Sequence, residues 1–137
     1  MVDWSSSPKI NQTRNERIPT MPVKNINDYP KEPVAAGVKT YRQVLIGPEV
    51  GPHFAMRRFI IERGGEIPLH TNTVEHEQFV LAGRARLLLG KETFEVKTHD
   101  VVFMPAGVKH SYTQIGDEAF EFLCLVPNEK DVMEIVT

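Results

Sequence analysis

Three histidines with defined spacings are the residues of this sequence best suited to hold a metal ion. His70 and His76 are six positions apart, and His110 follows 34 positions later. Side chains of an extended strand alternate faces with a period of two. In one continuous register, a single face would therefore carry His70, Asn72, His76 and Gln78. A half-buried strand has little reason to turn imidazoles inward unless something binds them, and neutral imidazole is a common ligand of divalent metals.

Short alternating segments separated by turn signals surround these histidines. The apparent turns include 47–52, with two glycines and two prolines, and 63–65, with the sequence RGG. About eight strands and no helical periodicity longer than two turns indicate an all-β sandwich or barrel. The C-terminal tail, 128–137, fits either a short strand or a helical turn. The segments that read as strands are 41–47, 53–62, 77–83, 84–90, 92–105 (broken at His99-Asp100), 110–115 and 118–127.

Two motifs at compatible positions resemble the signature of the cupin family. The first cupin motif is a glycine, five residues, H-x-H, three or four residues, a carboxylate and, six residues on, a glycine. Its glycines and first histidine are matched by GGEIPLHTNTVEHEQFVLAG at 64–83. The second motif is G-x5-P-x-G-x2-H, and PAGVKH at 105–110 matches its end, while His99 replaces the leading glycine. The resemblance covers roughly 33–127. Over this range the sequence is similar to small single-domain cupins of an oxalate-decarboxylase-like subgroup.

The resemblance implies the cupin double-stranded β-helix, a jelly-roll barrel whose interior can enclose a ligand. We expect the cupin domain to span 34–137. Residues 1–33 are polar and contain five prolines, so we expect an irregular N-terminal arm. The arm is either a disordered tail or a segment that docks on a second subunit and buries Trp4. Because small cupins are commonly dimers, the resemblance also implies a homodimer.

The resemblance also implies a ligand set for the metal. Counting back from the closing glycine of the first motif places His76 at the position of the motif's carboxylate, and the subgroup tends to have histidine there. At the second H-x-H position this chain has Asn72 where the subgroup usually has histidine. We therefore expect His70, His76 and His110 to be ligands, with Asn72 as a weak oxygen ligand or a supporting group. The alternative is a barrel with hydrogen-bonded core histidines and no metal.

The donor types limit which metal such a site would take. Nitrogen and oxygen donors without thiolate suit Mn or Fe, and also Ni, Co or Zn. Three imidazoles leave open positions for water or substrate. Because no carboxylate is among the expected ligands, the charge of the metal would be uncompensated, and we expect an anionic, chelating substrate.

Four further residues are candidates for contact with the substrate. Gln78, Tyr112 and Cys124 should face the interior by strand alternation, and each is either a proton-handling group or part of the core. Arg57 and Arg58 are adjacent, so one of them should point inward and could bind an anion. The subgroup has arginine at 57, and we therefore choose Arg57.

Composition excludes several other classes of function. The chain has 137 residues, enough for one domain, and a net charge of −2 without a basic segment, so we expect no nucleic-acid partner. A single cysteine rules out a disulfide within the chain. We see neither a signal peptide nor an apolar run long enough for a membrane helix, so we expect a cytoplasmic protein without a membrane partner.

These observations lead to one favoured function and three alternatives. The favoured function is a metal-dependent enzyme that acts on a small anionic metabolite by decarboxylation, isomerisation or lyase chemistry. The alternatives are a non-haem iron dioxygenase, thiol-dependent group transfer through Cys124, and a cupin that binds a ligand without catalysis.

Overall fold

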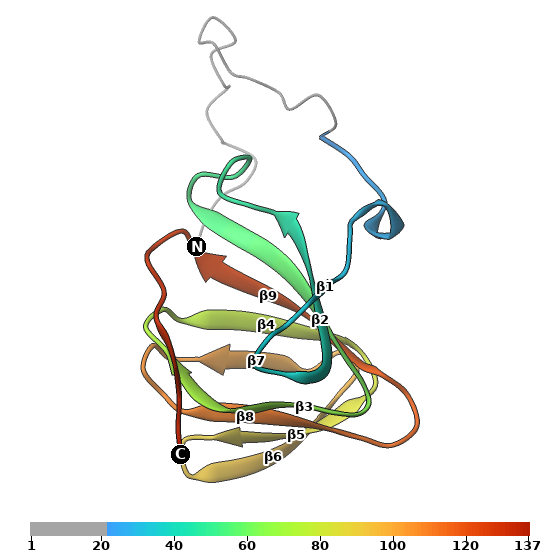
Figure 1. Cartoon of the computed structure of the whole chain (residues 1–137), viewed down its shortest axis with the longest axis vertical. Coiled ribbons are helices and arrows are strands. Elements are labelled where there is room, and N and C mark those ends of the chain that lie inside the picture. The colour runs from blue at the N-terminus through green and yellow to red at the C-terminus, as the bar shows by residue number, and fades with distance from the viewer. Residues whose placement is uncertain (1–21) are drawn as a thin grey trace, which may run out of the picture.

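The computed structural model describes residues 22–137, so Trp4 and most of the expected arm lie outside the described part. Nearly all regular structure is extended, as the turn spacing predicts, and Figure 1 shows the strands curled into a barrel. One 3-10 helix, Ile26–Asp28, precedes the strands. The strands are β1 (Glu32–Pro33), β2 (Val38–Ile46), β3 (Phe54–Asn72), β4 (His76–Ala82), β5 (Arg84–Leu89), β6 (Glu92–Lys97), β7 (Val101–Met104), β8 (His110–Ile115), β9 (Phe120–Pro127) and β10 (Met133–Ile135).

The long strand β3 connects the two halves of the barrel. The strand order is β6-β5-β8-β3-β9-β4-β7, and β2 pairs with the other side of β3. The first part of β3, 54–61, pairs with β9, whereas 66–70 pairs with β8. In Figure 1, β9, β4 and β7 accordingly lie side by side in one half, and β8, β5 and β6 in the other.

The turn expected at 63–65 is wrong, because β3 continues through these residues. Gly64 has a φ of +81°, which is favourable for glycine, so the strand bends sharply there without breaking. At Gly65 a Cβ atom would lie 2.6 Å from the carbonyl oxygen of Val38, so a larger residue would not fit against β2. The two glycines thus redirect β3 from one half of the barrel to the other.

The core fills one end of the barrel and leaves the other end open. Tyr112, Phe120 and Phe122 are almost fully buried, with ring centroids 5.0 to 5.4 Å apart. Ile61 and Val80 are completely buried beside them. Gln114 accepts a hydrogen bond from the Gly64 amide and donates to backbone carbonyls of the 115–118 turn, and these contacts close this end.

The C-terminal tail is a strand, which settles the choice that the sequence leaves open. Strand β10 pairs with the end of β3, where Ile135 lies opposite His70 and Met133 opposite Asn72. The tail therefore crosses the open end of the barrel, next to two of the expected metal ligands.

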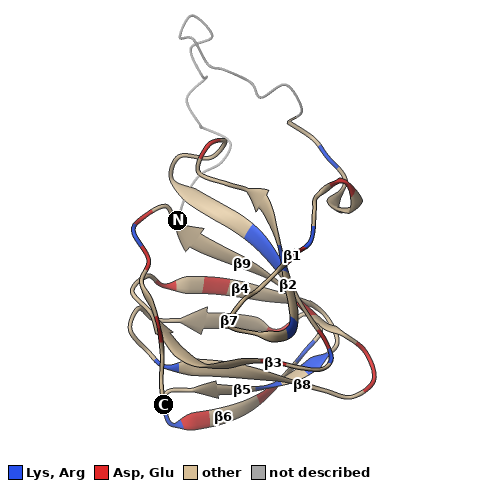
Figure 2. Ribbon diagram, viewed as in Figure 1, with Lys and Arg blue, Asp and Glu red and all other residues tan. Residues whose placement is uncertain are grey.

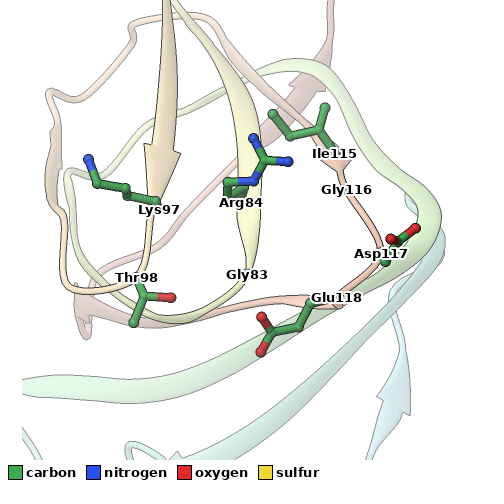
Figure 3. A pocket seen from close by; sticks show the side chains of 8 residues that line it. All are labelled: Gly83, Arg84, Lys97, Thr98, Ile115, Gly116, Asp117 and Glu118. Atoms are coloured by element: carbon green, nitrogen blue, oxygen red, sulfur yellow. The ribbon is translucent and has the colours of Figure 1, made fainter.

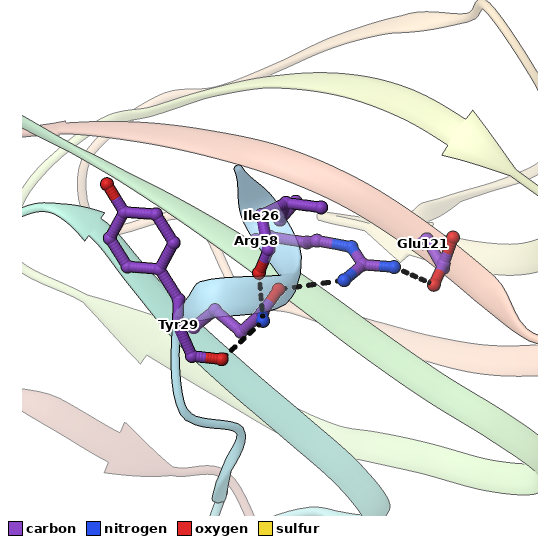
Figure 4. Close-up of polar contacts among 5 residues, drawn as sticks. Ile26, Tyr29, Arg58 and Glu121 are labelled. Carbon is purple, nitrogen blue, oxygen red and sulfur yellow. Dashed lines mark hydrogen bonds and ion pairs between the residues drawn. The ribbon is translucent and has the colours of Figure 1, made fainter. Parts of the chain in front are cut away.

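The part of the expected arm that is described packs on the outside of the barrel. Gln43 donates hydrogen bonds to the carbonyl oxygens of Ile26 and Tyr29, at 3.0 and 2.9 Å. Arg58 donates to the Gln43 side-chain oxygen at 2.7 Å and forms an ion pair with Glu121, as Figure 4 shows. Arg58 therefore faces outward and attaches the 3-10 helix to β2, β3 and β9.

Charged residues of both signs are interspersed over the strands in Figure 2. Among the described residues, no helix is both long and apolar enough to span a bilayer. The cytoplasmic location and the absence of a nucleic-acid partner stay predictions.

Candidate metal and substrate site in the barrel

The open end of the barrel contains a cavity of about 230 Å³. The core of the barrel supplies its floor, and the β1–β2 region and the C-terminal tail supply its rim. All eight expected site residues line it: Arg57, His70, Asn72, His76, Gln78, His110, Tyr112 and Cys124. The other lining residues are Val34, Arg42, Phe59, Ile67, Phe122, Asp131 and Met133.

The three histidines reach the cavity from three strands. His70 on β3 lies directly opposite His110 on β8, and their ring centroids are 4.2 Å apart. His76 begins β4, with its ring centroid 5.8 Å from that of His110. The chain leaves the strand between Asn72 and His76, yet even-numbered residues from 70 to 80 are all buried. The alternation thus predicts the faces correctly, although His70 and His76 belong to different strands. Glu75 and Glu77, at odd positions of the same stretch, are exposed.

Backbone carbonyl groups orient two of the imidazole rings. His70 Nδ1 lies 2.7 Å from the carbonyl oxygen of Pro68, and His110 Nδ1 lies 2.9 Å from that of Val108. A carbonyl oxygen only accepts, so Nδ1 carries the proton in both rings. In this tautomer a neutral ring has a free lone pair on Nε2, and a metal ligand requires such a lone pair.

The cavity keeps His76 and His110 uncharged at neutral pH. Burial is the main cause that lowers the pKa of His76 to about 4, and the positive charge of Arg57 acts in the same direction. Burial is also the main cause that lowers the pKa of His110 to about 4. Neutral imidazoles can bind a metal ion without first losing a proton.

Asn72 is oriented by a residue that the sequence did not suggest. Its side-chain nitrogen donates to Asp131 Oδ2 at 2.9 Å, while Asp131 Oδ1 accepts from the Thr73 amide, also at 2.9 Å. With the nitrogen held by the tail, the side-chain oxygen of Asn72 is buried and has no hydrogen-bond partner among the described residues. Asp131 lies 59 positions from Asn72, and no motif or alternation connects them.

Every buried side-chain nitrogen or oxygen without a partner in residues 22–137 belongs to a residue that lines this cavity. Buried polar atoms are normally hydrogen-bonded, so a cluster of unsatisfied ones indicates a site for a missing group. The four atoms are Arg42 Nε, Arg57 Nε, Asn72 Oδ1 and His76 Nε2.

The donor set fits a metal, although the side chains are not in coordinating positions. Within the described residues, no three His, Cys, Asp or Glu side chains are arranged to hold an ion as they stand. The free Nε2 atoms of His70 and His110, the unpartnered His76 Nε2 and the unpartnered Asn72 Oδ1 are nevertheless donors that a transition metal accepts. The expected ligand set stays a prediction.

The four other candidates form a connected set on one wall. The Tyr112 hydroxyl donates to Gln78 Oε1 at 2.6 Å, and the Gln78 nitrogen lies 3.6 Å from Cys124 Sγ. Arg57 also donates to Cys124 Sγ, at 3.3 Å, and its guanidinium lies over the Phe59 ring. Tyr112 therefore fixes the amide orientation of Gln78, and the Cys124 sulfur accepts hydrogen bonds from Arg57 and Gln78.

The ionisation of this wall argues for binding and orientation more than for proton transfer. Burial raises the pKa of Tyr112 far above its ordinary value, with a smaller effect from the charge of Cys124. Burial also raises the pKa of Cys124, although Arg57 opposes this effect. Both groups thus keep their protons at neutral pH.

One arginine and two histidines lie away from the cavity. Arg58 faces the outer side of the sheet, so Arg57 is the inward member of the pair. His53 and His99 are exposed between strands.

A larger hollow of about 430 Å³ lies at the opposite end, between the turns after β4, β6 and β8 (Figure 3). Its charged side chains Arg84, Lys97, Asp117 and Glu118 are all exposed. Arg84 is paired with Glu95 at 2.7 Å. The smaller cavity is the better candidate despite its size, because its donors are buried, unpartnered and convergent.

Comparison with known proteins agrees with this architecture. Residues 57–126 match the Cupin_2 model, described as a cupin domain. A protein of Rhodospirillum rubrum named 1-methylthio-D-xylulose 5-phosphate methylsulfurylase is 30% identical over 109 residues, which cover 80% of this chain and 69% of that protein.

Solved structures show the same likeness. The polyketide cyclase RemF from Streptomyces resistomycificus superposes with a TM-score of 0.76 and 27% identity, covering 84% of this chain and 86% of that one. A cupin-2 domain protein of Rhodospirillum rubrum, Rru_A2000, gives a TM-score of 0.69 with 30% identity, covering 80% and 73% of the two chains.

Proposed function

Because the chain belongs to the Cupin_2 family of cupin domains, we propose that it is an enzyme that uses a divalent transition metal to act on a small anionic metabolite. The observation that carries the proposal is the set of imidazole and amide donors without partners in one buried cavity. Relatives named as a cyclase and a methylsulfurylase support an enzymatic role.

In this proposal, His70, His76 and His110 hold the metal, and the Asn72 oxygen is a fourth ligand or supports them. Mn or Fe is the favoured ion, because the donors are nitrogen and oxygen without thiolate. When bound, the metal supplies Lewis-acid polarisation of a carbonyl or carboxylate oxygen.

The protein's own groups bind and orient the substrate. Arg57 offers an unpartnered Nε–H to an anionic group, and its fixed charge remains at any physiological pH. Gln78, held by Tyr112, directs its amide nitrogen toward Cys124. The apolar rings of Phe59 and Phe122 exclude water from this wall and strengthen the electrostatic contacts there.

Metal analysis of the full-length protein, purified without chelator, tests the proposal. We expect about one transition-metal ion per chain in the wild type, a large loss in His76→Ala and His110→Ala, and no loss in His99→Ala, whose imidazole is exposed. Equal metal content in all four proteins, or none in the wild type after metal is added, would contradict the proposal.

Thiol-dependent group transfer is a second candidate, because the Cys124 sulfur lies in the cavity and accepts from Arg57 and Gln78. The name of the Rhodospirillum rubrum relative describes transfer of a sulfur-containing group. If this candidate is correct, Cys124→Ser abolishes turnover and leaves metal content unchanged. Full turnover by Cys124→Ser with the same substrate would eliminate it.

We also propose that the protein is a homodimer, as small cupins commonly are.

A further inference from the structure

Two arginines with unpartnered nitrogens lie on one side of the cavity. Arg57 and Arg42 both line it, and the Nε atom of each is buried without a partner among the described residues. Buried N–H groups are rarely left without an acceptor, so two of them on residues that line one cavity indicate a bound group that accepts hydrogen bonds.

The strand register brings these arginines together. Arg42 on β2 lies opposite Phe59 on β3, and Arg57 is two residues from Phe59 on the same strand. Residues two apart in a strand share a face, so the arginines are diagonal cross-strand neighbours, whose Cα atoms are typically about 7–8 Å apart. Figure 2 shows basic positions where β1, β2 and β3 run beside one another.

The cavity has little negative charge to balance these guanidinium groups. Within residues 22–137, Asp131 is the only acidic residue that lines it, and its two oxygens already accept hydrogen bonds from Asn72 and Thr73. Glu32 on β1 contacts Arg42 from the rim at 3.4 Å, with both side chains substantially exposed. A contact of that length and exposure is weak, so a better-placed anion could replace Glu32.

The unpartnered atoms thus divide into two groups of opposite chemistry. Arg42 and Arg57 offer donors, whereas Asn72 and His76 offer the oxygen and nitrogen atoms that suit a cation. Of the cavity's two arginines, only Arg57 lies within the stretch that matches the family model, 57–126. Arg42 therefore lies outside the part of the barrel that the family model describes.

We propose that Arg42 and Arg57 form an oxyanion subsite at the mouth of the cavity, so that the substrate is a two-ended anion. One end, a chelating carboxylate or enolate, lies toward the histidines; the other, a phosphate or carboxylate tail, lies between the arginines. This inference rests on the proposed function for its first end, while the arginine subsite can be tested without a metal.

Anion titration of metal-free, full-length protein tests the subsite directly. The probe is inorganic phosphate, followed by backbone amide shifts in NMR spectra. We expect saturable shifts in wild type and at least about tenfold weaker binding in Arg42→Gln and in Arg57→Gln. Arg86→Gln is the matched control, because Arg86 is exposed on β5 and does not line the cavity.

A second variant tests the subsite even if the arginine variants do not fold. Glu32→Gln removes the carboxylate that competes for Arg42 at an exposed position, so we expect phosphate to bind several-fold more tightly. Glu92→Gln, remote on β6, should bind phosphate as wild type does. Weaker or unchanged binding in Glu32→Gln would overturn the idea that the anion takes the place of Glu32.

Two-ended probes distinguish a phosphate from a carboxylate tail. With Mn²⁺ added, phosphoglycolate or succinate should bind more tightly than glycolate, and Arg42→Gln should abolish this difference in affinity. Tighter binding of phosphoglycolate indicates a phosphate tail, and tighter binding of succinate indicates a carboxylate tail. If Arg42→Gln and Arg86→Gln bind all probes like wild type, the subsite is refuted. Metal content, measured on the same samples, reports separately on the proposed function.

Discussion

Asn72 is the residue at which this site differs most from the pattern that its family resemblance implies. An amide at this position can direct either its oxygen or its nitrogen into the cavity. Asp131 determines the choice, because a carboxylate accepts from the nitrogen and leaves the oxygen facing inward. The metal-binding role of Asn72 therefore depends on a residue in the C-terminal tail.

Asp131→Asn tests this dependence. The new amide has one acceptor oxygen for two donors, the Asn72 side chain and the Thr73 N–H, and so no longer fixes Asn72. We expect metal affinity to fall roughly 10-fold or more, as is typical when a group that orients a ligand is lost. Competition titration with a chromophoric chelator measures the affinity.

The control for this prediction is Glu129→Gln, an exposed charge change in the same segment. A double-mutant cycle identifies the route of the effect: in an Asn72→Ala background, Asp131→Asn should change metal affinity little. Full additivity of the two substitutions would show that Asp131 acts independently of Asn72.

The buried histidines also predict how stability depends on pH. His76 and His110 have a pKa of about 4 in the folded chain, against 6.5 in the unfolded chain. The unfolded state therefore binds more protons between these values, and stability is lost as pH falls through this window. From pH 7 to 5.5 the two groups together should lower the free energy of unfolding by about 2 kcal/mol.

Urea unfolding of chelator-treated protein measures this slope. The double variant His76→Gln/His110→Gln should show a much flatter profile between pH 7 and 5.5, while His99→Gln keeps the wild-type slope because His99 is exposed. A flat wild-type profile would mean that the two imidazoles titrate in the folded protein as they do in the unfolded chain.

The period-two alternation predicted the inward side chains well, because a strand buried on one face exposes every second residue whatever its partners are. It placed Gln78, Tyr112 and Cys124 inward, and all three line the cavity. Asp131 and Arg42 could not be found in this way. Their positions depend on the pairing of β10 with β3 and of β2 with β3, which the local sequence does not encode.

Among the elements, β3 shows where turn signals mislead. The sequence RGG is typical of a turn, but here it lies within a continuous strand, because the same conformational freedom of glycine also allows a bend. The bend places His70 near His110 on β8 and Arg57 near Cys124 on β9. Strand β3 thus contributes residues to both the histidine group and the arginine pair, which would bind the two ends of the proposed substrate.

The 3-10 helix Ile26–Asp28 is held to the barrel through one buried amide. Gln43 is 1% exposed and contacts two carbonyls of the helix region and the Arg58 guanidinium. Gln43→Ala removes all three of these hydrogen bonds, so we expect a loss of roughly 2 kcal/mol or more in unfolding free energy.

Limited proteolysis and urea unfolding measure the effect of Gln43→Ala together. Cleavage should become faster within 22–33, ahead of cleavage in the barrel. Val38→Ala, at a position of β2 that is 47% exposed, is the control and should change neither property much. Unchanged proteolysis in Gln43→Ala would show that other contacts hold the helix in place.

At the scale of the whole molecule, the outer side of one half of the barrel is unusually apolar. The register aligns one row across five strands: Phe103, Glu77, Leu125, Met56 and Ile46. The next row begins with Val101, Phe79 and Leu123. Val101 is 79% and Phe103 53% exposed. We call these two rows the outer apolar face.

A second copy of the chain is the partner that we propose for the outer apolar face. Strands lie about 4.8 Å apart, so the first row extends about 19 Å, and apolar patches of such extent mark interaction sites. In a two-fold dimer each copy presents the same face, so both hide their apolar side chains in a single contact. The proposed homodimer would thus pack through these sheets and leave the mouths of both cavities accessible.

Phe103→Glu tests this arrangement. The charge would be buried without a partner in the dimer but solvated in the monomer, so we expect sedimentation equilibrium to show a dimer for wild type and a monomer for the variant. Val38→Glu places the same charge at an exposed apolar position outside the face and should remain dimeric. A monomeric wild type, or dissociation caused by Val38→Glu and not by Phe103→Glu, would assign another role to this face. Because β4 and β9 carry residues of both the outer apolar face and the cavity, a confirmed dimer would place its interface on the reverse side of strands that line the site.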